Sequence, residues 1–296
     1  MDLPPVPADL DARLRTFLAE DLGAGDVTAR CFVPRDARSG AALTAKAAGV
    51  VAGADLALPI VRLLDPTATG SAVAVDGTVV APGQVVARLA AATPALLAAE
   101  RTLLNLVQHL SGIATHTARF VAAVAGTGAR ILDTRKTLPG LRWFAKRAVV
   151  AGGGMNHRHG LYDQVLIKSN HLAFTRPWPL GQRPLEAAIA AARRQVPAGM
   201  KVEVEVFDGD EAVRAAAAGA DYVLLDNFTP EQVAVAVGRV RARFRPEQVA
   251  LEASGGIDLG NVRAFALAGV ERISIGALTH SAPALDLSLR FDGADA

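Results

Sequence analysis

The chain has a single cysteine, Cys31, among its 296 residues. One thiol excludes an intrachain disulfide and a structural zinc site built from several cysteines, so the cytoplasm is the expected compartment. The first eleven residues contain three prolines and three acidic residues, whereas an export signal needs a basic start and an apolar run. We therefore expect no export signal.

Long apolar runs and an excess of one charge are also missing. Apolar stretches such as residues 187–192 end well short of the roughly 20 residues that a membrane helix requires. The 31 basic and 29 acidic residues nearly cancel, which disfavours a nucleic-acid-binding surface. Because 51% of the residues are hydrophobic, we expect a globular protein that binds neither membrane nor nucleic acid.

Basic residues are nevertheless concentrated in one strip of the sequence. Between Arg130 and Arg158 there are seven arginines or lysines and one acidic residue. A local cluster of this size suits a small polyanion in a pocket better than a nucleic-acid groove.

The first part of the chain predicts a small α+β domain followed by a long helix. Short β-like segments at residues 41–45, 49–52, 77–81 and 84–89 are separated by glycine and proline turns. Thr93-Pro94 is typical of a helix start, and leucines recur at helical spacing up to Ser111-Gly112. We expect this helix to join an N-terminal domain, residues 1–112, to a catalytic domain, residues 113–280.

From Ala129 onward short strands alternate with helices, which predicts a parallel sheet. The repeat of about twenty to thirty residues favours an α/β barrel, TIM-like and not necessarily complete, and a doubly wound sheet is the alternative. Polar residues or glycines stand at the expected strand ends, where a barrel gathers its catalytic groups. They are Asp133, Lys168, Glu205, Asp226, Ser254 to Gly256 and Gly276.

Two motifs in the basic strip could bind anions. Arg135 and Lys136 are adjacent in a loop that follows a strand, so they could offer a bidentate fork and a point charge, although a solvated basic turn would look the same. Three glycines precede His157 and Arg158 and would let the backbone approach a ligand. A lone histidine is more often structural, and His157 with His159 lacks the spacing of a metal site.

Carboxylates and further glycines follow later in the chain. Glu203 and Glu205 alternate with valines, so they share one face of a strand, which lies inside the barrel or, alternatively, on a wet edge. Asp226 ends the next strand, and carboxylates there could hold Mg2+ or ribose hydroxyls. The loops Ser-Gly-Gly at 254–256 and Ile-Gly-Ala at 275–277 are typical of a phosphate cradle after the last barrel strands.

The segments DTRKTLPGLR, GGGMNHRHGLYDQVLIKSNH, VEVEV, LLDNF, LEASGGI and SIGALTHS together resemble the quinolinate phosphoribosyltransferase family. The resemblance implies an α/β barrel preceded by an α/β sandwich domain, to which a C-terminal tail, residues 281–296, returns. It also implies that quinolinate and phosphoribosyl pyrophosphate react, with Mg2+, to give nicotinate mononucleotide, pyrophosphate and CO2. The family forms homodimers with shared sites, and assembly beyond the dimer is left open.

The resemblance assigns roles to individual residues. Lys136, Lys168, Glu205 and Asp226 would be catalytic, and Glu205 and Asp226 would meet Mg2+ mainly through the substrate pyrophosphate. Arg101 would reach the site of the partner chain. The expected substrate-binding residues are Arg101, Thr134, Arg135, Lys136, His157, Arg158, Lys168, Glu205, Asp226, Ser254, Gly255, Gly256, Ile275, Gly276 and Ala277.

Two departures from the family pattern and two rival functions accompany this interpretation. Ser169 stands where aspartate is common, and residues 174–184 replace a shorter loop. The rivals are a related transferase with another acceptor, such as nicotinate, and a catalytically silent sensor of phosphorylated sugars. The four cations Arg135, His157, Arg158 and Lys168 exceed what a monocarboxylate needs, which favours quinolinate.

Overall fold

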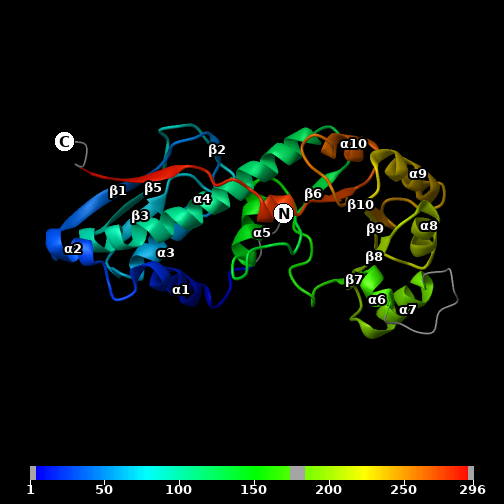
Figure 1. Cartoon of the computed structure of the whole chain (residues 1–296), viewed down its shortest axis with the longest axis horizontal. Helices are drawn as coiled ribbons and strands as arrows, with labels where there is room; N and C mark the ends of the chain where they lie inside the picture. The colour runs from blue at the N-terminus through cyan, green and yellow to red at the C-terminus, as the bar shows by residue number, and fades with distance from the viewer. Residues whose placement is uncertain (1–4, 174–183, 293–296) are drawn as a thin grey trace. The chain divides into compact units, whose positions relative to one another are not determined.

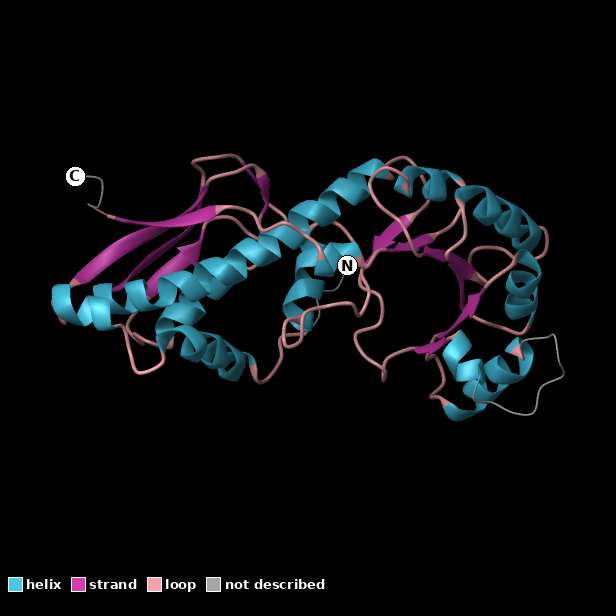
Figure 2. Cartoon of the chain, in the orientation of Figure 1, coloured by secondary structure: helices cyan, strands magenta, loops and turns pink. Residues whose placement is uncertain are grey.

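The chain contains an antiparallel and a parallel sheet, each in its own unit (Figures 1 and 2). The computed structural model describes residues 5–173 and 184–292. Unit 1 comprises residues 1–118, 138–153 and 278–296, and unit 2 comprises residues 119–137 and 154–277. Apart from Pro184, the loop singled out at residues 174–184 lies outside the described residues.

Unit 1 is built on a four-stranded antiparallel sheet. Its strands are ordered β12 (Leu287–Phe291), β1 (Arg38–Ala45), β5 (Val85–Ala92) and β3 (Thr69–Ala72). A separate pair is formed by β2 (Gly49–Val50) and β4 (Val79–Val80). Strand β12 joins residues near the end of the chain to β1, with Ala41 opposite Phe291 and Ala45 opposite Leu287.

The helices of unit 1 include the predicted long helix, which is longer than expected. The described helices are α1 (Leu10–Leu22), α2 (Val27–Phe32), the 3-10 turn η1 (Ala54–Leu56), α3 (Ala57–Arg62), α4 (Thr93–Ala123), α5 (Arg142–Ala151) and α11 (Ala277–His280). Helix α4 and the short helix α11 both cross the boundary between the two units. The predicted end of this helix at Ser111-Gly112 is wrong, since α4 continues to Ala123. Both residues make tertiary contacts instead of ending the helix. The Ser111 hydroxyl accepts from the Ala52 amide at 3.1 Å, and a side chain at Gly112 would collide with the Pro283 carbonyl.

Unit 2 contains a six-stranded parallel sheet with helices outside its curve (Figure 2). The strands are β6 (Arg130–Leu132), β7 (Val165–Ile167), β8 (Val202–Val206), β9 (Tyr222–Asp226), β10 (Ala250–Ser254) and β11 (Arg272–Ser274). The helices are α6 (Ser169–Ala173), α7 (Leu185–Gln195), α8 (Gly209–Ala217), α9 (Pro230–Arg241) and α10 (Val262–Leu267).

The strand order of unit 2 is that of an incomplete barrel. It runs β6-β11-β10-β9-β8-β7, so the first strand of the unit pairs with the last, as barrel closure requires. A doubly wound sheet would instead reverse its order at a switch point, so that alternative is wrong. Within the described residues β6 and β7 are not paired, and the sheet stays open between them.

Alternation along the strands separates an apolar face from a polar one. In β8 the valines at 202, 204 and 206 are fully buried, while Glu203 and Glu205 project from the opposite face. Both glutamates are also buried, at 0% and 5% exposure, and β8 lies between β7 and β9. The alternative of a wet edge strand is therefore wrong.

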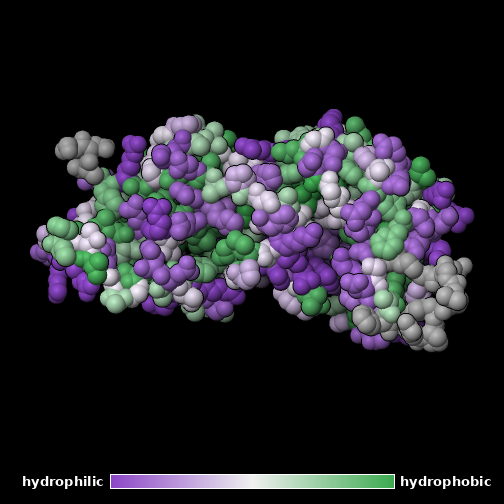
Figure 3. Space-filling model, in the orientation of Figure 1, coloured by the Kyte–Doolittle hydropathy of each residue, from purple (hydrophilic) through white to green (hydrophobic). Residues whose placement is uncertain are grey.

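On the face seen in Figure 3, hydrophilic and apolar side chains are interspersed in small groups. None of the helices in the described part of the chain has the length and apolar character of a membrane span.

Candidate active site

The carboxyl ends of the parallel strands bring most of the predicted site residues to one edge of the sheet of unit 2. Asp133 follows β6, Lys168 follows β7, and Asp226 and Ser254 end β9 and β10. Register confirms this alignment, since Ser254 lies opposite Asp226 on one side and Ser274 on the other. Arg101 belongs to unit 1, where it is exposed on α4.

Two arginines near β6 and β7 form a cationic pair. Arg135 lies in the loop after β6, and its buried Nε has no hydrogen-bond partner among the described residues. Arg158 donates from Nη1 to the Gln164 carbonyl at 3.3 Å. Burial, and then the neighbouring charge of Arg135, lower the pKa of Arg158. Two guanidinium groups that repel each other in a partly buried place favour a bound anion.

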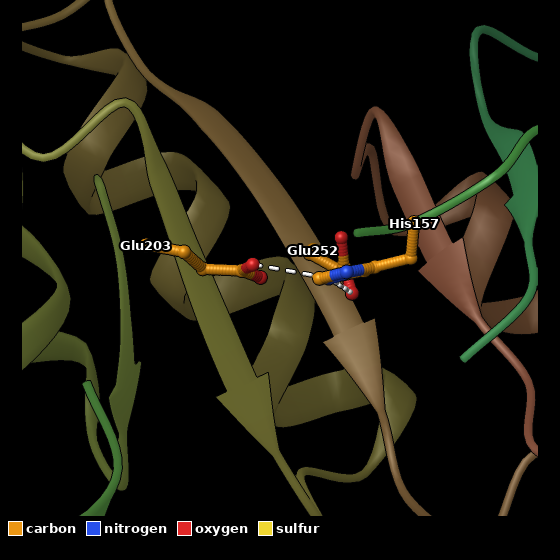
Figure 4. Close-up of side chains that lie close together, drawn as sticks. All are labelled: His157, Glu203 and Glu252. Atoms are coloured by element: carbon orange, nitrogen blue, oxygen red, sulfur yellow. Dashed lines mark ion pairs between the residues drawn. The ribbon is translucent and has the colours of Figure 1, made fainter. Parts of the chain in front are cut away.

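His157 lies at the centre of a buried cluster that sequence spacing alone does not reveal. Its Nε2 lies 3.0 Å from Oε2 of Glu203 on β8 and 3.4 Å from Oε1 of Glu252 on β10. Figure 4 shows the ring turned toward both carboxylates. Arg272 on β11 closes the cluster with a 2.7 Å contact from its Nε to Glu252.

The backbone and Gln164 complete the contacts of this cluster. The His157 amide donates to Oδ1 of Asp133 at 2.8 Å, and the Arg158 amide donates to Nδ1 of His157 at 2.7 Å. The Gln164 side chain donates to Glu203 at 2.5 Å. Both ring nitrogens of His157 are therefore engaged by the protein.

The charges of the cluster determine where its protons lie. Burial and the charge of Glu252 raise the pKa of Glu203. Against the effect of burial, His157 and then Arg272 lower the pKa of Glu252 to about 2. Burial lowers the pKa of His157, but Glu203 and Glu252 outweigh this effect and raise the pKa to about 9. Nδ1 must nevertheless keep its lone pair, because it accepts from the Arg158 amide. We place the ring proton on Nε2, because a protonated Nδ1 would face another N–H.

Three atoms of this cluster, from His157, Glu203 and Glu252, lie within 4.8 Å of one another and could in principle surround a metal ion. The guanidinium of Arg272 already neutralises Glu252, and Nε2 of His157 points its proton at the carboxylates. A metal would have to displace that proton beside a fixed cation. The cluster is better described as a hydrogen-bonded ionic network.

Lys168, Glu205 and Asp226 form a second, more open group. Lys168 Nζ lies 3.1 Å from Oε2 of Glu205, and the Ser169 amide donates to Oε1 of Glu205 at 3.2 Å. Burial raises the pKa of Glu205, but the hydrogen bonds from the Ser169 amide and then from Lys168 outweigh this effect, so the pKa is lowered. Burial and the charge of Glu205 raise the pKa of Asp226, which Lys168 and Lys136 partly offset. Ser169 therefore supports Glu205 here.

Two glycines with left-handed backbone conformation form the loop after β10. A side chain at Gly255 would collide with Oδ1 of Asn227, and both Gly255 and Gly256 have positive φ angles, 95° and 62°. A side chain at Gly256 would meet open space. Gly276 and Ala277 follow the adjacent strand β11, while Ile275 is buried and donates its amide to Leu132.

Two expectations from the sequence change in detail. Gly152 is needed because a side chain there would collide with the Ala114 carbonyl of α4, which makes this glycine a packing residue. Asn227, Gln164 and Glu252 were not expected as site residues, yet they contact residues that were, and Arg272 contacts Glu252. The available signal was a charged residue inside an apolar strand, as in Leu251-Glu252-Ala253.

An open parallel barrel with cations, paired carboxylates and a glycine loop on one edge defines an α/β enzyme that acts on anionic substrates. The C-terminal domain model of quinolinate phosphoribosyl transferase matches residues 113–290, and the N-terminal domain model matches residues 26–111. The chain belongs to the quinolinate phosphoribosyltransferase family.

Individual relatives match over nearly their whole length. The chain is 42% identical to the nicotinate-nucleotide pyrophosphorylase (carboxylating) of Mycobacterium leprae, with 93% of this chain and 95% of that protein covered. It is 39% identical to the human protein of the same name, with 97% and 93% covered. The solved structure of the nicotinate-nucleotide pyrophosphorylase from Francisella tularensis superposes with a TM-score of 0.87 at 37% identity, covering 99% of each chain.

Proposed function

We propose that this chain joins quinolinate to phosphoribosyl pyrophosphate and releases nicotinate mononucleotide, pyrophosphate and CO2. The observation that carries the proposal is the pairing of Arg135 and Arg158 beside the group of Lys168, Glu205 and Asp226. A dicarboxylate needs two cationic partners, and the buried Nε of Arg135 lacks a partner among the described residues. Membership of the family, at about 40% identity over the full length, supports the reaction.

The quinolinate half of the site comprises Arg135, Arg158 and Lys168, with His157 and Thr134 beside them. The guanidinium groups would bind the two ring carboxylates and hold the pyridine nitrogen toward the ribose. The charge that lowers the pKa of Arg158 in the free protein would be neutralised when the dianion binds. Binding is therefore expected to relieve an existing repulsion.

The phosphoribosyl half comprises Lys136, Glu205 and Asp226, with the cradle of Ser254, Gly255 and Gly256 and of Ile275, Gly276 and Ala277. The positive φ angles of Gly255 and Gly256 suit a loop that turns backbone amides toward a 5′-phosphate. Burial and the charge of Glu205 raise the pKa of Asp226, so the two carboxylates lie within electrostatic range of each other. Their oxygen atoms fit Mg2+, which would neutralise the charge that develops on the leaving pyrophosphate.

The reaction then has two steps that these residues can support. The pyridine nitrogen attacks the anomeric carbon while the bond to the pyrophosphate oxygen breaks and its electron pair leaves with pyrophosphate. The bond from the ring to the 2-carboxylate breaks next, CO2 departs, and the electron pair stays on the ring carbon, which takes a proton. Glu205 and Asp226 stabilise positive charge on the ribose, and Lys136 or Lys168 stabilises the carbanion.

Arg101 makes the proposal depend on a second chain. It is exposed on α4, and the family resemblance gives it to the site of the partner in a homodimer. Inactive Arg101→Ala and Lys168→Ala protomers are expected to recover activity when mixed, because a mixed dimer rebuilds one complete site. Absence of recovery despite demonstrated subunit exchange would contradict a shared site.

The assay that tests the function mixes the protein with Mg2+, phosphoribosyl pyrophosphate and quinolinate. Nicotinate mononucleotide and CO2 are expected in equal amounts, and chelation by EDTA should abolish turnover until Mg2+ is restored. Turnover with nicotinate instead of quinolinate would establish another acceptor. Binding of both ligands without turnover would identify a sensor.

A further inference from the structure

We infer that His157 is a positioning residue, which sets the orientation of Arg158 and does not bind a substrate carboxylate. Its imidazole has two nitrogens, and both are occupied by the protein. Nδ1 accepts from the Arg158 amide at 2.7 Å, and Nε2 lies 3.0 Å from Glu203. With 7% of the residue exposed, no ring N–H is left to donate to a ligand.

Glu203, Glu252 and Arg272 fix the position of this ring. Glu203 on β8 and Glu252 on β10 are fully buried on either side of β9, and Arg272 contacts Glu252 at 2.7 Å. Arg272 is itself held over the Tyr222 ring, with 4.1 Å from the guanidinium carbon to the ring centroid. A chain of contacts thus runs from rigid strands to the histidine.

Arg158 receives two restraints from this network. Its backbone is held by Nδ1 of His157, and its Nη1 donates to the carbonyl of Gln164. The side chain of Gln164 in turn donates to Glu203. Glu203 is therefore tied to Arg158 twice, through the histidine ring and through Gln164. Asp133 anchors the same loop by accepting from the His157 amide.

A double-mutant cycle separates positioning from direct binding, and it rests on the proposed function. KM for quinolinate is measured at saturating phosphoribosyl pyrophosphate for His157→Gln, Arg158→Gln and the double variant. If His157 acts through Arg158, His157→Gln alone raises this KM about tenfold, the usual effect of losing a hydrogen bond to a charged group. The double variant then matches Arg158→Gln, and KM for phosphoribosyl pyrophosphate stays within about twofold throughout. Losses that multiply would overturn the inference.

Two further variants show whether a change in KM for quinolinate arises from lost positioning or from a general disturbance of the fold. Gln164→Ala keeps the backbone carbonyl that accepts from Arg158 but removes the side-chain bond that ties this carbonyl to Glu203. It is expected to raise KM for quinolinate in the same selective way, also without added effect in the Arg158→Gln background. Glu271→Gln is the matched control, since Glu271 pairs with Arg241 at 2.7 Å just before β11, at the opposite edge of the sheet. It should leave both KM values unchanged. If the unaltered protein shows no turnover, the proposed function fails; turnover with multiplying losses overturns only the role of His157.

Discussion

Two partly buried clusters that contain arginine, one in each unit, differ in whether every arginine pairs with a carboxylate. In unit 1, Arg147 contacts Asp55 and Asp76 at 2.8 Å each and lies 5.8 Å from the centroid of the Trp143 ring. In unit 2, the cluster around His157 borders Arg135 and Arg158, which form no ion pair with a described carboxylate. Removing an arginine that pairs with partly buried carboxylates destabilises a fold, whereas arginines without such a partner prepare a binding site for an anion.

The largest effect is expected from removing a surplus cation. Arg158→Gln should lower kcat/KM for quinolinate by about 100-fold or more, since a charge-assisted contact to a carboxylate is worth roughly 2–5 kcal/mol. Its free energy of unfolding should change by less than about 0.5 kcal/mol, because the lost charge faces Arg135. Steady-state kinetics and urea unfolding test both parts. A large loss of stability would show that Arg158 stabilises the fold in the way expected of Arg147.

Arg147→Gln should show the opposite pattern. The Arg147 side chain is 13% exposed, and breaking a buried ion pair costs about 3 kcal/mol because the carboxylates lose their counter-charge. We expect this decrease in the free energy of unfolding with kcat/KM unchanged at temperatures where the variant is folded. A selective change in KM for either substrate would break the comparison.

Asn227, beside Asp226 in unit 2, tests backbone strain, and a smaller effect is expected there. It has a φ of 59° and donates from Nδ2 to Oδ2 of Asp226 at 2.8 Å. Asn227→Ala should cost about 1 kcal/mol in stability because alanine disfavours this backbone conformation. Asn227→Gly should recover that stability, and both variants should raise KM for phosphoribosyl pyrophosphate by loosening Asp226. Equal stability of the two variants would contradict the backbone explanation.

The smallest effect concerns acid stability in unit 1. The Thr67 hydroxyl, and then the Ala92 amide, lower the pKa of Asp65 to about 2 from an ordinary value of 3.8. A lowered pKa stabilises the fold above pH 3.8, and the contribution is lost as the pH falls through about 2. Asp65→Asn should therefore reduce Tm near pH 6, and the difference should shrink toward pH 2. A difference independent of pH would contradict this linkage.

Patterns with a fixed period were readable from the sequence, and contacts between distant segments were not. Alternation in Val202–Val206 predicted the two faces of β8, and polar strand ends predicted the edge that carries Lys168 and Asp226. The short polar strand β3 has no such alternation, whereas β12 alternates but is a single short stretch near the end of the chain; β3 pairs with β5 and β12 with β1. The length of α4 was misjudged because Gly112 serves packing against Pro283.

The sequence by itself determined the class of chemistry, because cations, glycines and carboxylates at strand ends are local features that every barrel collects at one edge. Tertiary structure decided which of them touch a ligand and which support another residue. His157 and Glu203 are 46 positions apart in the sequence, yet their side chains lie 3.0 Å apart, because Asp133 after β6 holds the His157 amide while Glu203 projects from β8. Such contacts depend on strand register, which no short segment specifies.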